Sequence, residues 1–84
     1  MTIEVIKNKK LNDYKAWPVW ECAPSKFDWE YDKEEHCYVL EGEVRVEGAD
    51  NTVDIVAGDY VIFSKGLKCV WEVKKAIKKH YSFY

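Results

Sequence analysis

One stretch of the sequence, Phe27–Gly42, carries most of the side chains that could do chemistry. Trp29 and Tyr31 occupy alternate positions in it, so on a strand both would lie on one face. Glu35 follows at the end of an acidic run and precedes an apolar, strand-like segment. Aromatic faces suit a planar ligand, a sugar ring or a cation, and a carboxyl group desolvated among them is usable as a general acid or base. The residue types therefore indicate a binding site without specifying a reaction.

A second stretch, Gly58–Val73, has the features of a partner for the first. It begins with a Gly-Asp turn, continues as a β-rich run, breaks at Lys-Gly, and ends in a strand that carries Cys69 and Trp71 in alternation. With Cys22 and Cys37 the chain has three cysteines and no CxxC spacing, which favours neither a disulfide framework nor a zinc knuckle. We expect Cys22 and Cys37 to pack in the core. We expect Cys69 to be inert, because no histidine is placed to activate it.

The size and charge of the chain exclude several classes of partner. Its 84 residues are expected to form one domain spanning 1–84, near the lower size limit for a single core, and the 15% aromatic content helps such a core to close. A net charge of −2 gives no field that would attract nucleic acid. No segment has the length and apolarity of a membrane span, and no signal-like segment begins the chain. We therefore expect a cytoplasmic protein with neither a nucleic-acid nor a membrane partner.

Charge is distributed unevenly along the chain. Acidic residues gather in the first stretch, and lysines gather in the C-terminal third: Lys65, Lys68, Lys74, Lys75, Lys78 and Lys79. We expect most of these groups to lie on solvated strand faces and turns. A homodimer is possible, because acidic and basic edges attract and a small β-domain gains by covering its edge strands. The aromatic segment Trp17–Trp20 around Pro18 is a candidate contact.

Alternating, β-branched segments predict a chain built of short strands. The predicted strands are 2–6, 36–40, a hairpin of 43–47 and 52–56, 60–63, 67–73 and 77–84; 16–22 is an edge strand or irregular extended segment, and 8–15 is a loop or one helical turn. About eight strands with closely spaced turns and no long helix indicate an all-β sandwich or barrel.

The two stretches resemble the two motifs of the cupin superfamily. Glu35, six residues and Gly42 match the end of the first motif, and Gly58 and Gly66 match the glycine framework of the second, with Ser64 in place of its proline. The sequence is similar to one subfamily that includes ureidoglycine aminohydrolase-like domains and ethanolamine-utilisation-like cupins. That similarity extends from about residue 17 to the end and is carried by Gly58, Asp59, Phe63, Gly66, Trp71, Val73, Lys79 and Tyr81. It implies a single cupin jelly-roll β-barrel.

The resemblance does not extend to the metal ligands. Metal-binding cupins have His-x-His before the glutamate and a further histidine in the second motif. Trp29, Tyr31, Glu35 and Cys69 stand at these positions here. An indole has no lone pair for a metal, a phenol ligates seldom, and one glutamate with one thiol is too few ligands. We therefore expect no metal and no other cofactor.

The resemblance implies that Trp29, Tyr31, Glu35, Cys69 and Trp71 meet at the mouth of the barrel. Three classes of function are compatible with such a set. The chain could bind a small metabolite without a metal. It could be an isomerase, lyase or aminohydrolase-like enzyme that uses Glu35 and Tyr31 as an acid–base pair. It could also be a structural or interaction protein whose aromatic residues plug the barrel. Whether the protein is an enzyme stays open at this point.

Overall fold

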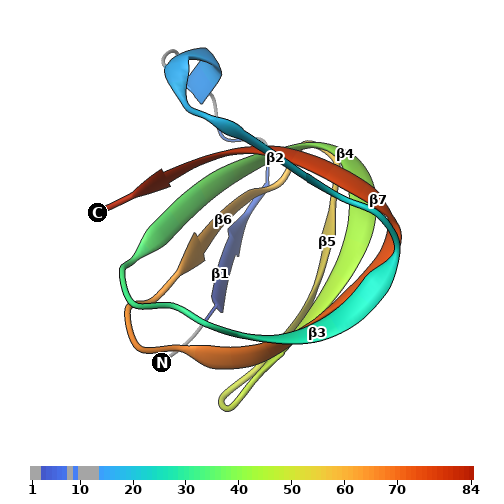
Figure 1. Cartoon of the computed structure of the whole chain (residues 1–84). Helices are drawn as coiled ribbons and strands as arrows, with labels where there is room; N and C mark the ends of the chain where they lie inside the picture. The colour runs from blue at the N-terminus through green and yellow to red at the C-terminus, as the bar shows by residue number, and fades with distance from the viewer. Residues whose placement is uncertain (1–2, 8, 10–13) are drawn as a thin grey trace.

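The computed structural model describes residues 3–7, 9 and 14–84, and these form an antiparallel β-barrel (Figure 1). The barrel contains seven strands and one 3-10 turn: β1 (Ile3–Ile6), η1 (Tyr14–Ala16), β2 (Val19–Cys22), β3 (Ser25–Glu30), β4 (Glu35–Gly48), β5 (Thr52–Val56), β6 (Tyr60–Phe63) and β7 (Lys68–Phe83). All of these strands belong to one sheet, ordered β1-β6-β4-β7-β2, in which β3 also pairs with β7 and β5 with β4. The predicted all-β barrel is confirmed. Within the described ranges, no helix is long and apolar enough to cross a membrane.

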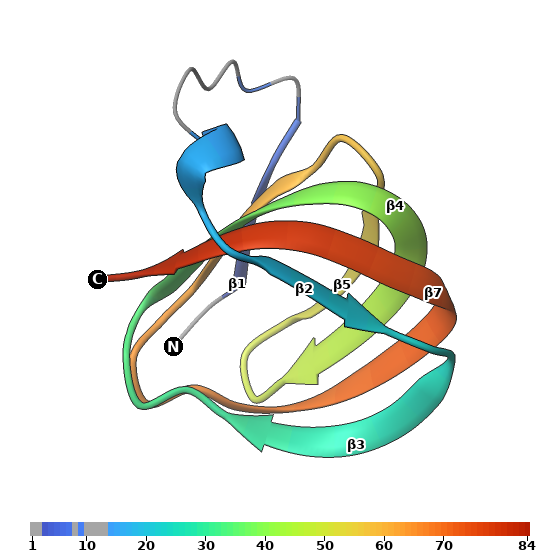
Figure 2. The same cartoon turned by 45° about the horizontal axis from the view of Figure 1, so that its top comes forward.

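Two long strands, β4 and β7, wrap around the barrel and pair with each other along their length (Figure 2). The sequence predicted two short strands in place of each, with a break at Gly42 in β4 and at Lys74-Lys75 in β7, and that prediction is wrong. The ladder between them shifts register between Val39 and Val44, so the strands bend at this point and do not end. Such an irregularity increases the local bend and twist of a strand.

The remaining predicted strands are present within the described residues; residue 2 of the predicted strand 2–6 lies outside them. Strand β1 pairs with β6, and the β4–β5 hairpin forms with Val44 opposite Ile55 and Val46 opposite Val53. Strand β2 pairs with β7 alone among the described strands, as expected for the edge segment that follows Pro18. Of the predicted loop or helical turn at 8–15, residues 8 and 10–13 lie outside the described residues, and the turn η1 begins at Tyr14.

Alternate residues of the strands fill the core. Its most deeply buried side chains are Phe63, Ile55, Leu67, Ile77, Val39, Val44, Val46, Val61 and Cys37. Cys37 is therefore a core residue as predicted, and the half-buried Cys22 packs against the same cluster.

A buried aspartate holds the turn before β6. The Asp59 carboxylate accepts a hydrogen bond from the Val56 amide at 3.0 Å and forms an ion pair with Lys7 at 2.7 Å. Gly58 beside it has a φ of 93°, a conformation that costs residues other than glycine strain. The Gly-Asp pair of the second motif is therefore a structural turn that fixes the start of β6.

Gly42 provides a test of the bend in β4. Its φ is 103°, and a Cβ there would overlap the backbone of Ala76 and Ile77 on β7. We expect Gly42→Ala to lower the free energy of unfolding by more than about 3 kcal/mol, since strain and a backbone collision add. Gly58→Ala is the matched control, because it has a positive φ but open space around the new methyl group; it should cost about 1 kcal/mol. Equal losses in urea unfolding would contradict the proposed close approach of the two strands.

Candidate functional site

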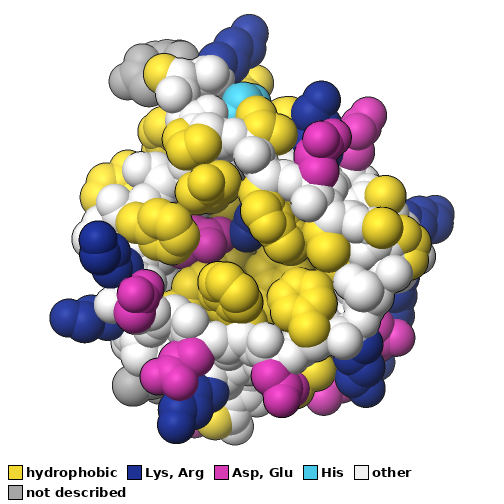
Figure 3. Space-filling model, viewed as in Figure 1, with side chains coloured by type: hydrophobic (Ala, Val, Ile, Leu, Met, Phe, Trp, Pro, Cys, Tyr) yellow, Lys and Arg dark blue, Asp and Glu magenta, His cyan; other side chains and the backbone are white. Residues whose placement is uncertain are grey.

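One end of the barrel is hollowed by a cavity of about 200 Å³ (Figure 3). Its lining consists of seven aromatic side chains and two charged ones: Trp20, Phe27, Trp29, Tyr31, Glu35, Trp71, Lys79, Tyr81 and Phe83. In the space-filling view, hydrophobic side chains surround the hollow, and an acidic and a basic group lie side by side within it. The aromatic side chains therefore line a cavity at this end of the barrel.

Strand β7 supplies the largest share of this lining. Trp71, Lys79, Tyr81 and Phe83 are separated by even numbers of residues, so alternation along the continuous strand directs them to the same face. Strand β2 lies beside β7 with Trp20 opposite Lys79. Strand β3 lies along the other half of β7, and β4 contributes its first residue.

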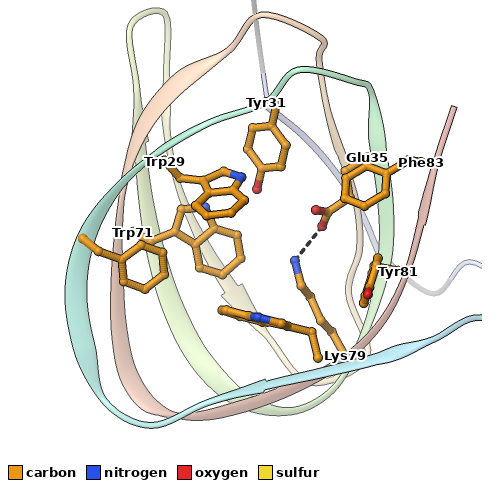
Figure 4. Close-up of a pocket in the computed structure, with 9 residues that line it drawn as sticks. Trp29, Tyr31, Glu35, Trp71, Lys79, Tyr81 and Phe83 are labelled. Carbon is orange, nitrogen blue, oxygen red and sulfur yellow. Dashed lines mark hydrogen bonds and ion pairs between the residues drawn. The ribbon is translucent and has the colours of Figure 1, made fainter.

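A buried ion pair lies inside the cavity (Figure 4). The Lys79 Nζ atom is 2.5 Å from a carboxylate oxygen of Glu35, and the two residues are only 4% and 5% exposed. The same ammonium group lies 4.7 Å from the ring centroid of Trp71 and 5.1 Å from that of Trp20. We expected most of the C-terminal lysines to be solvated, and Lys79 is an exception. Its charge is compensated by the carboxylate and by aromatic faces that attract cations.

Tyr31 is locked in place by the loop before β7. Its amide donates a hydrogen bond to the carbonyl of Leu67 at 2.9 Å, and its carbonyl accepts one from Gly66 at 2.6 Å. Its ring stacks on Phe63, with centroids 4.7 Å apart. Burial, and then the neighbouring Glu35 carboxylate, raises the pKa of the Tyr31 phenol far above its ordinary value. Tyr31 is therefore a neutral hydrogen-bond donor at physiological pH.

Glu35 and Tyr31, the predicted acid–base pair, both line the cavity. The hydrogen-bond partner of the Glu35 carboxylate is the Lys79 ammonium group. The Tyr31 hydroxyl points into the pocket toward these two charged groups from the other side (Figure 4). The cavity therefore brings together a carboxylate, an ammonium group and a phenol.

The two predicted tryptophans lie at different depths. Trp29 is 50% exposed at the rim, and its ring meets that of Tyr31 edge-on at 6.4 Å. Trp71 is 2% exposed in the inner wall. Its indole N–H lies close to the Tyr31 phenol and the Cys69 thiol. This proximity lowers the pKa of both groups, whereas burial raises it by more. The indole N–H nevertheless makes no hydrogen bond of normal geometry and is a buried, unpaired donor.

Cys69 does not line this cavity, although the sequence placed it there. It pairs with Trp29 across the β3–β7 ladder, and its thiol donates a weak hydrogen bond to the Trp29 carbonyl at 3.7 Å. Burial raises its pKa to about 11, so the thiol is neutral at physiological pH. Cys69 is therefore part of the buried core next to the cavity lining, and its neutral state agrees with the expected inertness.

The residues present do not fit the metal site of metal-binding cupins. Of the four corresponding positions, only Glu35 offers a carboxylate to the cavity, and that carboxylate holds an ammonium group. No group of three His, Cys, Asp or Glu side chains in the described part of the chain could hold a metal ion. The two histidines are engaged elsewhere. His36 bonds to the Tyr60 hydroxyl at 2.5 Å, and His80 donates to the Trp17 carbonyl at 3.0 Å.

Sequence reasoning missed Lys79, Trp20, Phe27, Tyr81 and Phe83 as lining residues. A signal for three of them was present, because Lys79, Tyr81 and Phe83 alternate along one strand with the apolar Ile77 and so share its inward face. The neighbouring lysines Lys74, Lys75 and Lys78 make this segment resemble a solvated strand face, so the inward position of Lys79 was not recognised. Trp20 belongs to the segment predicted as a dimer contact, and its half-buried ring packs edge-on against Trp71, with centroids 5.8 Å apart.

The buried ion pair generates a stability prediction. Either Glu35→Gln or Lys79→Met alone should lower the free energy of unfolding by about 3–5 kcal/mol, because each leaves an uncompensated buried charge. The double variant Glu35→Leu/Lys79→Met should recover most of that loss, since it removes both charges and keeps apolar volume. Arg45→Ala is the control: it removes an exposed ion pair to Asp54 at 3.3 Å and should cost less than about 1 kcal/mol. Additive losses in the double variant would show that the two groups are not paired.

The buried thiols and phenol generate a pH prediction. Burial raises the pKa of Cys37 from 9.0 to about 12 and that of Cys69 to about 11. Between pH 9 and about 12 the folded chain therefore binds more protons than the unfolded chain, so its stability should fall as pH rises through this window. Thermal unfolding from pH 8 to 11 measures the slope, and Cys37→Ala/Cys69→Ala should reduce it. An unchanged slope in that variant would contradict the assignment.

Comparison with known proteins identifies the family. The sequence model of the EutQ-like cupin domain matches residues 10–81. A DUF861 family protein from Thermotoga maritima is 39% identical, with a TM-score of 0.92, and the match covers 99% of this chain and 100% of that one. No curated protein matches the chain.

Two EutQ structures share the fold at lower identity. A putative ethanolamine utilization protein Q from Salmonella typhimurium is 24% identical, with a TM-score of 0.71 over 79% of this chain and 54% of its own. The EutQ protein of Clostridium difficile is also 24% identical, with a TM-score of 0.72 over 79% of this chain and 52% of its own. The match at 39% identity, together with a family model that spans most of the sequence, shows that this chain belongs to the EutQ-like cupin family.

Proposed function

We propose that this cupin binds a small metabolite in its aromatic pocket without the help of a metal. The observation that carries the proposal is the Glu35–Lys79 ion pair, which lies buried inside a cavity and not in solid core. Ligand pockets are concave, mostly apolar and furnished with a few convergent polar groups, and this cavity has that composition. Its volume of about 200 Å³ is suited to a compound of one small ring or a short chain.

The polar groups favour a particular kind of ligand. Lys79 already occupies the aromatic surroundings beside the carboxylate, so a second cation would be repelled. The ammonium group, the Tyr31 hydroxyl and the unpaired Trp71 N–H are all hydrogen-bond donors. The site therefore has more hydrogen-bond donors than acceptors. We therefore infer a neutral or anionic ligand that presents an acceptor oxygen and a planar body that can lie against Trp29.

The same arrangement supports an acid–base enzyme as a second candidate. A buried carboxylate and a neutral phenol on opposite sides of a cavity could move a proton to and from a bound compound. The partner of Glu35 in that case is Lys79, with Tyr31 as a donor to the ligand.

Nuclear magnetic resonance of the tryptophan indoles tests the proposed pocket. Trp20, Trp29 and Trp71 line the cavity, and Trp17 does not, so the protein contains its own control. Titration with benzoate, nicotinate and benzamide as planar acceptor probes should shift the three pocket indole N–H signals and leave that of Trp17 unchanged. Trp29→Ala should weaken binding by roughly tenfold through loss of ring stacking. The absence of a pocket shift with all three probes, or an equal shift of Trp17, would contradict the proposal.

A further inference from the structure

Lys79 has the surroundings of a reactive amine. It is buried, its Nζ atom lies in a cavity, and it is bounded by the rings of Trp71, Trp20 and Phe63 at 4.7, 5.1 and 5.7 Å. Proteins use the amine of a buried lysine as a nucleophile when a neighbouring group can accept its proton. The Glu35 carboxylate supplies such a proton acceptor 2.5 Å from the Nζ atom.

We propose that Lys79 forms a Schiff base with a small planar aldehyde or ketone bound in this pocket. The inference rests on the proposed function, since the carbonyl compound must first enter the cavity. A carbonyl oxygen is the acceptor that the donor-rich site lacks, and the carbonyl carbon would then face Nζ. Nothing else in the described chain offers a buried amine: Lys79 is its one buried lysine.

Glu35 completes the proton balance of this reaction. Transfer of a proton from the Lys79 ammonium to the Glu35 carboxylate converts a buried ion pair into a neutral amine and a neutral acid. The amine lone pair then forms the C–N bond as the carbonyl π electrons move to oxygen. One N–H proton moves from the nitrogen to that oxygen, which gives a neutral carbinolamine. Glu35 returns its proton to the departing hydroxyl, and water leaves. Overall, an ammonium ion and a carbonyl become a protonated imine and one water, with no oxidant or reductant.

Tyr31 and the aromatic walls assist the same step. The Tyr31 phenol keeps its proton and points toward the two charged groups, so it can donate a hydrogen bond to the carbonyl oxygen as negative charge develops there. The walls formed by Trp20, Trp71 and Phe83 limit the access of water that would hydrolyse the imine.

Reductive trapping tests the inference on the intact chain. Folded protein is incubated at neutral pH with benzaldehyde and sodium cyanoborohydride, which reduces an imine to a stable benzylamine, and labelled lysines are quantified by peptide mass spectrometry. We expect Lys79 to be benzylated on the order of tenfold faster than Lys78, because binding beside the amine raises the local concentration of the carbonyl. Lys78 is the matched control, as its neighbour in sequence and outside the cavity lining.

Two variants separate the roles of the groups. Lys79→Arg keeps a cation but cannot form an imine, so it should lose the fast label and keep the slow labelling of other lysines. Glu35→Gln should slow labelling of Lys79 several-fold relative to Lys78 in the same sample. Labelling of wild-type Lys79 no faster than Lys78 would overturn the inference. The outcome is distinct from failure of the proposed function, because probe-induced shifts of the three pocket indoles would persist in that case.

Discussion

A lysine side chain can lie inside this small barrel only because a carboxylate lies beside it. Moving an unpaired ammonium group out of water costs several kcal/mol or more, a large part of the free energy that holds a domain of this size together. Glu35 at 2.5 Å and the faces of Trp20 and Trp71 compensate that cost. The carboxylate is held in the same way, because its nearest partner is that lysine. Neither group is tolerable at this depth alone, so the two positions depend on each other.

The wrapping of β4 around β7 makes that pairing possible. In the ladder, Lys79 lies opposite Val39, four residues beyond Glu35 on the same strand, and Glu35 lies opposite Phe83. The long lysine side chain spans this offset along the interior of the barrel. The bend at Gly42 allows both strands to continue around the barrel, so the carboxylate at one end of β4 and the aromatic residues near both ends of β7 reach one cavity. The backbone conformation of Gly42 therefore helps to set the pairing of β4 with β7, and this pairing brings Glu35 and Lys79 together in the pocket.

Much of the fold could be predicted from the sequence because alternation and turn residues are local signals. The β4–β5 hairpin and the short strand β6 followed from them, whereas the cupin glycine framework followed from the resemblance to a known family. The continuity of β4 and β7 could not, since a glycine or a pair of lysines ends a strand in most settings. In this fold β4 and β7 pair with each other on both sides of the bend, and this pairing keeps both strands continuous.

The site was predicted in part for a related reason. Trp29, Tyr31, Glu35 and Trp71 were identified by type and spacing, and the structure places all four around the cavity. Cys69 alternates correctly with Trp71 and is buried in the same core cluster, yet it is not among the residues that line the cavity. Lys79 was missed because a lysine among lysines resembles a solvated face. Its burial is decided by Glu35, which lies 44 residues away in the chain, and no local pattern reports that contact.

The most direct test of the central claim is a high-resolution crystal structure of the ligand-free protein, with anomalous scattering data to detect any metal. We predict Lys79 Nζ within hydrogen-bonding distance of the Glu35 carboxylate, inside a cavity that holds ordered water and no anomalous peak. A metal ion bound to Glu35, a lysine side chain turned out to solvent, or a cavity closed by the surrounding rings would contradict it.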